Sequence, residues 1–569
     1  MLTGVAKIVK IWSNREMRSN HESAPTNVTA SSKEVADLQR IVIEQQQTIH
    51  HLHQTIEKLE GQIKHQQERI EQMDGELKAL KKLNGKPKVK ASRLERSKTD
   101  SEGENKGKRA GSSKVSKKLS FEVDEERIIS PEKIPEGSKF NGYRDYDVQE
   151  LKLERHNIRF RLAEYLSEDG TTIVGQLPVE YRNGHFGSLL SGYILYQHYQ
   201  CRVTQSILHE QLEDWGIEIS KGQLNNILIE NKAHFHAEQQ QVLRVGLESA
   251  PYIHTDDTGA RHQGKNGYCT VIGNAFFTYF KSSGSKSRRN FLEILQGETI
   301  EYVLNDYAQA YLEGQPLAQK YRDRLSFSDA ILAQQPLDWQ AFLLEKGIVS
   351  AKAIQVISEA ALLGGVMCAG IESPLRILSD GAGQFNVLVH GLCWVHAERC
   401  LRRLQANTAE QRDNVAQIQD LLWQYYQQLK DYKQQPTDEG KTELSQAFDE
   451  VFGRCYLHHA SLNIVLKWFT DHKGELLRVQ GYPQFPLHNN DAETDIREVV
   501  IRRKISGGTR SDAGRKARDT FVGIKKTCRK LGVSFWQYLL SRIRQDKQIP
   551  PLPDLIRNKA TATQVILAT

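Results

Sequence analysis

The chain has 569 residues, of which 39% are hydrophobic and 26% are charged, with a formal net charge of +7 and a mean hydropathy of −0.56. This length predicts several domains, and the modest charge makes the position of the basic residues more informative than their number. The longest apolar runs, such as 354–370, are interrupted by Glu359 and predict no membrane span, and no secretory signal is recognisable, so we expect a cytoplasmic protein. The seven cysteines are odd in number and scattered, so we expect no disulfide framework, and they form no Cys-x2-Cys pair, which excludes a four-cysteine zinc ribbon.

The N-terminal region predicts a coiled coil. Residues 1–34 are polar and without periodicity, so we expect them to be disordered. In 35–83 two series of mostly apolar residues repeat every seven positions: Val42, Ile49, Ile56, Ile63, Ile70 and Leu77, and Leu38, Gln45, Leu52, Leu59, Gln66, Met73 and Leu80. Their alternating spacing of three and four is typical of a and d positions. We therefore predict a homodimer or higher oligomer; the alternative is a long solvated helix in a monomer.

Three further regions precede the predicted catalytic core. Residues 84–120 are rich in Lys, Ser and Gly and predict a basic flexible linker, which either binds phosphates without sequence preference or is a solubilising tether. Residues 121–185 contain short alternating runs typical of a small β-rich module, and they contain no cysteine that could bind zinc. Residues 186–248 predict helices.

Within this helical region, residues 208–228 have the form of a helix-turn-helix. An amphipathic helix ends at Gly216, Ile217 and Ile219 fill the turn, and Ser220 is placed to cap the second helix. The surface of the second helix would carry Lys221, Gln223, Asn225 and Asn226, side chains suited to base edges or phosphates. Helix pairs of this form also occur in proteins that do not bind DNA.

Three segments of 249–545 each deliver a carboxylate in a defined context. Residues 250–259 (APYIHTDDTG) predict a strand that ends in Asp256 and Asp257, and 268–280 predicts the hairpin that follows it. Residues 374–385 (PLRILSDGAGQF) predict a strand that delivers Asp380 to a turn, and the helical segment 488–497 (HNNDAETDIR) carries Glu493. A strand with an acidic end followed by a hairpin is how a ribonuclease-H-like fold begins. We therefore expect an α/β ribonuclease-H-like core with helical insertions at about 298–373 and 405–485, and a C-terminal tail at 546–569.

Two strand-borne aspartates and a helical glutamate suit two-metal phosphoryl transfer. Carboxylate oxygens are the ligands that Mg²⁺ and Mn²⁺ prefer. Two such ions about 4 Å apart can activate an attacking oxygen and stabilise a leaving one. We therefore expect Asp256, Asp380 and Glu493 to bind Mg²⁺ or Mn²⁺, with two ions in the site.

These segments resemble the ordered motifs of the insertion-sequence-66 family of bacterial transposases. The similar stretches are HTDDTG, LSDGAGQF, GLCWVHAERCLRRL and NNDAETDIREVVIRRKISGGTRSDAG, and the similarity extends from about Phe186 to Leu555. The resemblance implies that Asp256, Asp380 and Glu493 form the DDE triad of a metal-dependent transposase. It implies double-stranded DNA as partner, both transposon ends and target, and leaves room for accessory proteins encoded by the same element.

The sequence departs from the family pattern in three places. Asp257 replaces the glutamate that follows the first catalytic aspartate, which leaves Asp257 as the alternative first ligand. The region 121–185 lacks the zinc-binding cysteines usual in the family, and 298–373 is longer than we expect. Cys393, His396 and Cys400 offer three zinc ligands at best, and we favour a packed cysteine and a histidine that orients its helix or the acidic cluster.

A dense group of basic residues follows Glu493. We expect Arg497, Arg502, Arg503, Lys504 and Arg510, with Lys221 and Asn225 of the helical region, to contact DNA. The predicted function is cleavage at transposon ends followed by strand transfer to target DNA. Two alternatives stay open: a nuclease of the same core fold without strand transfer, and a catalytically decayed transposase that only binds DNA.

Overall fold

The computed structural model describes residues 122–178, 181, 184–249, 251–368, 375–406 and 408–568, with a few positions between 45 and 59. The chain divides into two compact units, Met1–Lys90 and Ala91–Thr569. In the first unit the described residues are helical, and Ile49, Leu52, Ile56 and Leu59 are 51–54% exposed. Most of the predicted coiled coil, like 1–34 and 84–120, lies outside the described residues, so dimerisation through it stays a prediction.

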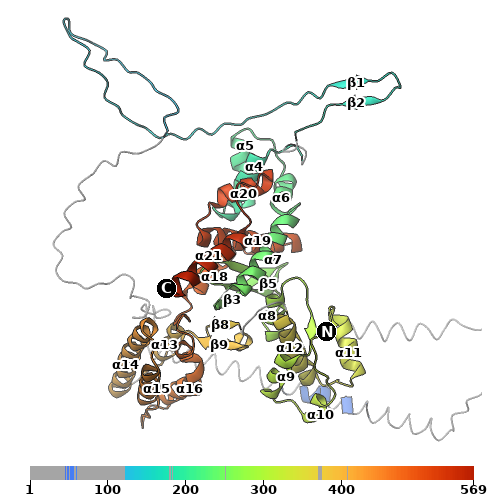
Figure 1. Ribbon diagram of the computed structural model, residues 1–569, viewed down its shortest axis with the longest axis vertical. Helices are drawn as coiled ribbons and strands as arrows, with labels where there is room; N and C mark the ends of the chain where they lie inside the picture. Colours follow the sequence, from blue (N-terminus) through green and yellow to red (C-terminus); the bar gives the residue numbers. More distant parts are fainter. Residues whose placement is uncertain are drawn as a thin grey trace, which may run out of the picture. The chain divides into compact units, whose positions relative to one another are not determined.

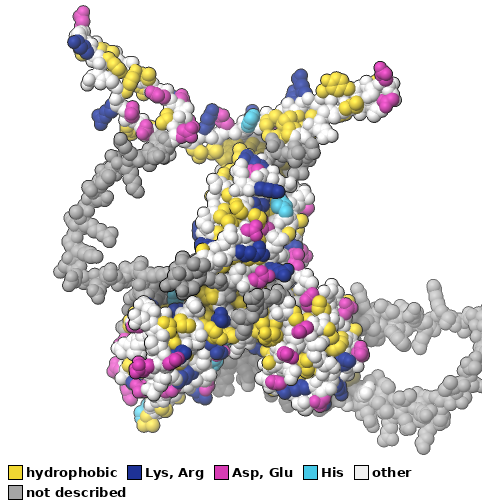
Figure 2. Space-filling model, viewed as in Figure 1, with side chains coloured by type: hydrophobic (Ala, Val, Ile, Leu, Met, Phe, Trp, Pro, Cys, Tyr) yellow, Lys and Arg dark blue, Asp and Glu magenta, His cyan; other side chains and the backbone are white. Residues whose placement is uncertain are grey.

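The second unit begins with a largely irregular segment, 122–178. Its regular structure is an antiparallel hairpin of β1 (Glu164–Leu166) and β2 (Thr172–Val174) (Figure 1). Apolar side chains along this segment are exposed, among them Ile129 at 89% and Tyr146 at 90% (Figure 2). The segment therefore contains less strand than its alternating sequence predicts, because its apolar residues are not buried against a second layer.

Four helices follow: α4 (Ser188–Tyr199), α5 (Gln205–Asp214), α6 (Lys221–Ile229) and α7 (Ala233–Glu248). The chain reverses between α5 and α6 at Gly216, whose φ of +68° suits glycine. Ser220 and Gln223 form a capping box at the start of α6, and Ile219 is buried beneath the turn. The predicted helix pair is therefore present, and its contact with DNA stays a prediction.

The central sheet has the strand order β5-β4-β3-β8-β9. The strands β3 (Ile253–His262), β4 (Lys265–Gly273) and β5 (Thr278–Ser283) are antiparallel, whereas β8 (Arg376–Ser379) and β9 (Val389–Leu392) run parallel to β3. Helix α18 (Asn490–Ser506) packs on β3 and β4, and α19 (Asp512–Leu531) packs on β5. This mixed sheet is compatible with the predicted ribonuclease-H-like core.

The chain between β5 and β8 forms the first helical insertion. Its elements are α8 (Arg288–Gln296), β6 (Tyr302–Val303), α9 (Asp306–Glu313), α10 (Gln319–Arg322), β7 (Ile331–Ala333), α11 (Pro336–Glu345) and α12 (Ala351–Cys368). By length and composition alone, α12 is the one helix in the described part of the chain that could cross a membrane. However, 72% of it is buried against its neighbours, as in the core helix of a globular domain.

The second insertion lies between β9 and α18. It contains α13 (Trp394–Arg402), α14 (Ala409–Gln434), α15 (Asp438–Phe452), α16 (Ala460–Asp471), α17 (Lys473–Leu476) and the 3-10 turn η3 (Arg478–Gln480). Trp394 is fully buried among Tyr425, Phe448, Phe452 and Phe469, and its indole N–H donates to the carbonyl of Leu476 at 3.0 Å. This aromatic cluster gives the second insertion a core of its own.

The C-terminal region is helical. After α20 (Phe535–Arg544), α21 (Leu552–Ala568) packs on α7, where the sequence predicted a tail. Glu238 of α7 accepts hydrogen bonds from Arg542, Tyr538 and the backbone N–H of Leu552, and so joins the three helices. Leu552 and Ile556 are fully buried at this contact.

This packing predicts that Ile556→Ala destabilises the protein. Removing a fully buried isoleucine side chain should lower the free energy of unfolding by about 2–5 kcal/mol, measured by urea denaturation. Asn558→Ala on the same helix is the control, because Asn558 is exposed and its replacement should change stability by less than about 0.5 kcal/mol. Equal stability of the two variants would contradict the packing of α21.

Candidate active site

Asp256 lies within β3, not at its end. The strand continues to His262, but β8 pairs with it only at Ile253 and His254. The short strand β10 (Gly508–Thr509) pairs with its far end, at Arg261 and His262. The sequence predicted a strand that ends at the two aspartates. The strand instead continues past them to His262, and only its pairing with β8 ends before them, at His254.

Strand alternation separates Asp256 from Asp257. His254 and Ala260 face α18, since His254 Nε2 lies 3.6 Å from Asp495 Oδ2 and Ala260 packs against Ala492. Asp256 shares this face, because side chains two apart on a strand point the same way. Asp257 points to the opposite face, where Gln384 Nε2 donates to its Oδ2 at 2.5 Å. The face that meets α18 therefore presents Asp256.

Asp380 follows directly after β8, beside β3. Gly381 has a φ of +94°, and the backbone N–H of Ala382 donates to Asp380 Oδ1 at 3.0 Å. The 3-10 turn η2 (Gly383–Phe385) comes next. Because β8 is parallel to β3 and pairs His254 with Leu378, Asp256 and Asp380 occupy the same level of the sheet.

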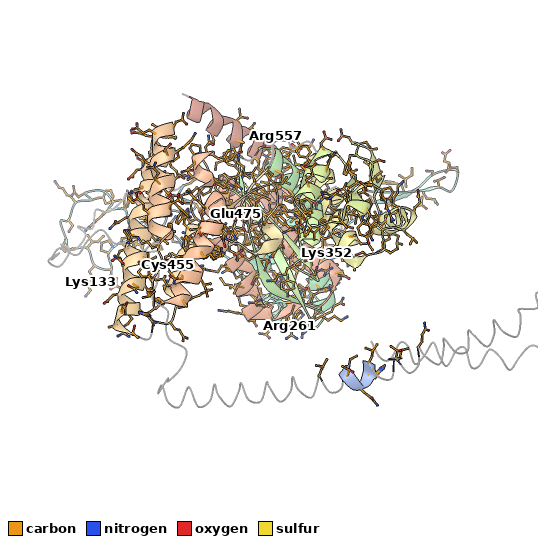
Figure 3. The ribbon with its side chains drawn as sticks, turned by 90° about the horizontal axis from the view of Figure 1, so that it is seen from below. Lys133, Arg261, Lys352, Cys455, Glu475 and Arg557 are labelled. Atoms are coloured by element: carbon orange, nitrogen blue, oxygen red, sulfur yellow. The ribbon has the colours of Figure 1, made fainter. Side chains whose placement is uncertain are left out.

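Both insertions contact this turn. From the second, Glu475 Oε1 lies 3.0 Å from His390 Nδ1, and His390 Nε2 lies 2.8 Å from the hydroxyl of Ser379, the residue before Asp380 (Figure 3 labels Glu475). From the first, Arg288 Nη2 donates to the carbonyl of Gly383 at 2.7 Å. The position of Asp380 is therefore supported from two sides.

Glu493 enters the site from the first turn of α18. Asn489 anchors this end of the helix: its side-chain amide donates to the carbonyl of Thr255 at 2.9 Å, and its backbone N–H donates to Cys393 Sγ at 3.1 Å. The Glu493 carboxylate accepts two hydrogen bonds from Arg399, Nη1 to Oε1 at 2.9 Å and Nη2 to Oε2 at 3.2 Å. His396 Nε2 lies 3.4 Å from Oε1.

Burial and neighbouring charges raise the pKa values of both aspartates of β3. Burial, then the negative charge of Asp380, raises the pKa of Asp256 to about 7, and Asp257 and Glu493 add to the effect. Burial also raises the pKa of Asp257, opposed by Lys286 and the hydrogen bond from Gln384. Among the described residues, no three His, Cys, Asp or Glu side chains are already arranged as metal ligands. The predicted triad is therefore a charge cluster in which Glu493 is paired with Arg399.

The cysteine and histidine after β9 have packing and positioning contacts. Cys393 is buried, which raises the pKa of its thiol to about 11, and its sulfur accepts the hydrogen bond from Asn489. Cys400 Sγ lies 3.5 Å from the carbonyl oxygen of His396. These contacts fit the packed cysteine and the histidine facing the acidic cluster that we favoured over a zinc site.

Much of the basic run after Glu493 is used inside the fold. Arg502 is only 9% exposed; it pairs with Glu498 at 3.2 Å and donates to the carbonyls of His198 and Tyr199. Lys525 pairs with Glu498 at 2.7 Å, and Lys530 with Asp495 at 2.7 Å. We therefore remove Arg502 from the predicted DNA contacts, because its guanidinium is engaged within the protein.

Other predicted DNA contacts lie at the surface. Arg497, Lys504 and Arg510 are exposed, whereas Arg503 is half-buried and donates to the carbonyl of Gly259. Lys221 is exposed at the start of α6, and the half-buried Asn225 accepts from Gln205 Nε2 at 3.2 Å.

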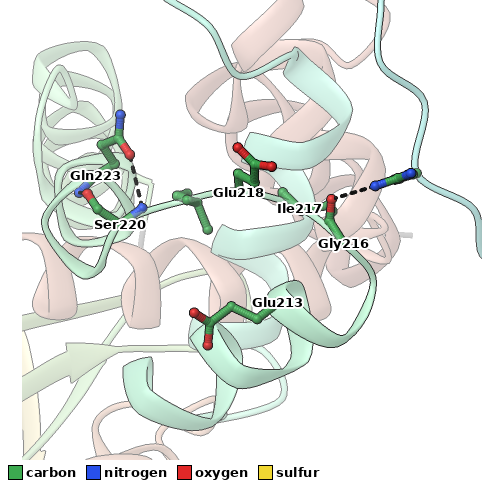
Figure 4. Close-up of a pocket in the computed structure, with 8 residues that line it drawn as sticks. Glu213, Gly216, Ile217, Glu218, Ser220 and Gln223 are labelled. Carbon is green, nitrogen blue, oxygen red and sulfur yellow. Dashed lines mark hydrogen bonds between the residues drawn. The ribbon is translucent and has the colours of Figure 1, made fainter.

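A hollow beside the turn between α5 and α6 is lined by Glu213, Gly216, Glu218 and Gln223 among others (Figure 4). Glu213 and Glu218 give this hollow two acidic side chains, and Arg155 gives it one basic side chain.

The sequence analysis missed Arg399, Gln384 and Lys286. Arg399 stands three residues after His396 on the same helix, a spacing that places both side chains on one face, and this signal could have indicated it. Gln384 of η2 bonds to Asp257, and Lys286, between β5 and α8, lowers the pKa of Asp257 by its charge; the sequence carries no local signal for either interaction.

Comparison with known proteins defines the class. The sequence model described as the Transposase IS66 family matches residues 183–318 and 376–517, which include all three carboxylates. The gap between the two matched regions, 319–375, lies mostly within 298–373, the stretch that we expected to be longer than in the family. An uncharacterized protein, y4jO of Sinorhizobium fredii (strain NBRC 101917 / NGR234), is 41% identical over 325 residues, 56% of this chain and 100% of the relative. The chain belongs to the IS66 family of transposases.

The buried ion pairs predict acid-sensitive stability. Burial raises the pKa of the Glu498 carboxyl, but its cationic partners, Arg202 first, outweigh burial and lower the pKa to about 2, below the value of about 4.3 in an unfolded chain. This depressed pKa contributes stability above about pH 4.3 that is lost as the pH falls towards about 2. Glu498→Gln should lower the free energy of unfolding near pH 7 by about 3–5 kcal/mol, since it leaves buried cations without a carboxylate.

The same variant should lose stability less steeply than wild type between pH 5 and pH 2, measured by urea denaturation across that range. Glu443→Gln, at an exposed position of α15, is the control and should follow the wild-type curve. An unchanged pH dependence in Glu498→Gln would contradict this role for the ion pairs.

Proposed function

We propose that this transposase cleaves phosphodiester bonds at the ends of its insertion sequence and joins the ends to target DNA, using Asp256, Asp380 and Glu493 as the DDE triad. The observation that supports this proposal is the charge interaction of Asp256 with Asp380 and Glu493, which are far apart in sequence. The adjacent parallel strands β3 and β8 supply the aspartates, and the first turn of α18 supplies the glutamate.

The donor set fits Mg²⁺ or Mn²⁺. The three side chains offer only hard carboxylate oxygens, and Asp256 and Asp380 already lie within one negatively charged cluster. When bound, two such ions would activate water or a 3′-hydroxyl and stabilise the leaving oxygen. Asp256, Asp380 and Glu493 would hold them, and Asp257, on the opposite face of β3, would not.

The surrounding residues hold these carboxylates in place. The Ala382 N–H and the Ser379–His390–Glu475 chain position the turn of Asp380, and Asn489 fixes the start of α18 against β3. Positioning of this kind is a large part of catalysis when charge develops on phosphate oxygens. Arg497, Lys504 and Arg510 lie exposed beyond Glu493 and would hold the DNA backbone.

The test uses labelled DNA carrying the element's ends, incubated with the full-length protein and Mg²⁺. Asp256→Asn, Asp380→Asn and Glu493→Gln should each reduce cleavage and joining by about a thousandfold or more, and chelation of the metal should do the same. Gel-shift affinity for the ends should persist in all three variants.

Asp257→Asn is the matched control, since its side chain faces away from α18 and bonds to Gln384. We expect it to keep most of the activity. If Asp257→Asn loses activity and Asp256→Asn keeps it, the first metal ligand is Asp257 and not Asp256. Cleavage without joining would indicate a nuclease, and binding with neither activity, unchanged in Asp380→Asn, would indicate a decayed transposase.

The exposed basic residues predict a measurable salt dependence. Lys504→Ala and Arg510→Ala should each weaken binding to any DNA sequence and reduce the slope of log affinity against log salt by about one. Lys467→Ala, at an exposed position of α16, serves as the control for loss of one positive charge. If Lys504→Ala and Arg510→Ala leave the slope at its wild-type value, the assignment of these two residues as DNA contacts is wrong.

A further inference from the structure

We propose that Arg399 is a catalytic residue with two alternating partners. It holds Glu493 before metal ions bind, and it moves to a DNA phosphate when the ions take that carboxylate. This inference rests on the proposed function, because it assumes that Glu493 is a metal ligand.

The first observation is the geometry of the pair. One guanidinium donates to both oxygens of Glu493, at 2.9 and 3.2 Å. A fork of this kind occupies one lone pair on each oxygen, and its positive charge competes with a metal ion for the same carboxylate. It also explains why no three ligating side chains of the described residues are yet arranged around a common point. Release of Glu493 by Arg399 would therefore make the carboxylate a stronger metal ligand.

The second observation is the position of the pair. The side chains are partly buried, with 19% of Arg399 and 22% of Glu493 exposed, so neither charge is fully solvated. When a metal ion takes the carboxylate, the guanidinium stays at this partly buried position beside the cluster, where a further anion would stabilise its charge. The substrate brings one: a phosphodiester at the carboxylate cluster carries oxygens that match the guanidinium fork.

The third observation is the helix that carries Arg399. Both Arg399 and His396 project from α13 onto Glu493, with Arg399 Nη1 3.1 Å from His396 Nε2. The buried Trp394 fixes α13 in the core of the second insertion. The side chain can therefore change partner while the helix stays in place. Once displaced, it would stabilise charge on the phosphate undergoing attack, as arginines do in other phosphoryl transfers.

The test measures Mn²⁺ binding to the full-length protein without DNA, by titration calorimetry or electron paramagnetic resonance, and separately measures DNA cleavage. Removing a competitor for Glu493 should tighten Mn²⁺ binding in Arg399→Ala by about tenfold, the scale of one charge-assisted hydrogen-bond pair. The same variant should cleave DNA about a hundredfold or more slowly. A purely structural arginine would not produce tighter metal binding together with weaker catalysis.

Arg403→Ala is the matched control, since Arg403 follows the same helix and is exposed. Arg403→Ala removes the same charge as Arg399→Ala. If it raises the Mn²⁺ affinity by a similar factor, Arg399 does not compete directly with the metal for Glu493, and the inference is wrong. Arg399→Gln repeats the test with a smaller change of shape, and thermal unfolding verifies that the variants are folded.

Two failures can be told apart. If the wild type binds Mn²⁺ and Asp380→Asn does not, but Arg399→Ala and Arg399→Gln bind it no more tightly than wild type, the inference is wrong and the proposed triad stands. If wild type and Asp380→Asn bind Mn²⁺ equally weakly, the proposed metal site fails and the inference fails with it.

Discussion

The carboxylate cluster depends on the neutralisation of two buried carboxylates of α18 by lysines of α19. Asp495 and Glu498 are each 3% exposed, and Lys530 and Lys525 lie 2.7 Å from them. Without those partners, such a carboxylate would favour the neutral form or a displaced helix. The pairs therefore fix how α18 lies on the sheet, and with it the point at which Glu493 meets β3. Lys525 and Lys530, which lie outside the carboxylate cluster, thus help to determine the position of Glu493.

The two insertions belong to the same support. Each sends one polar side chain to the turn after β8: Arg288 reaches the carbonyl of Gly383, and Glu475 reaches Ser379 through His390. The second insertion also supplies α13, whose arginine and histidine face Glu493. The insertions therefore complete the site as well as enlarging the chain.

Local patterns in the sequence predicted the elements well, and long-range partners poorly. The hairpin after Asp256, the turn at Asp380 and the cap at Ser220 follow from alternation, glycine and capping residues within a few positions. The pairing of Arg399 with Glu493 joins residues 94 positions apart, and the burial of Arg502 depends on α4. The sequence around a basic residue does not indicate whether its side chain contacts DNA or a buried carboxylate. Only the fold distinguishes the two.

The order of the strands and of α18 along the chain has a consequence for synthesis. A nascent chain that has emerged as far as β9 already holds both aspartates on neighbouring strands. It still lacks Glu493, and it lacks the α19 lysines that allow α18 to settle on the sheet. The proposed site is thus completed late in translation, after both insertions and α18 have been synthesised.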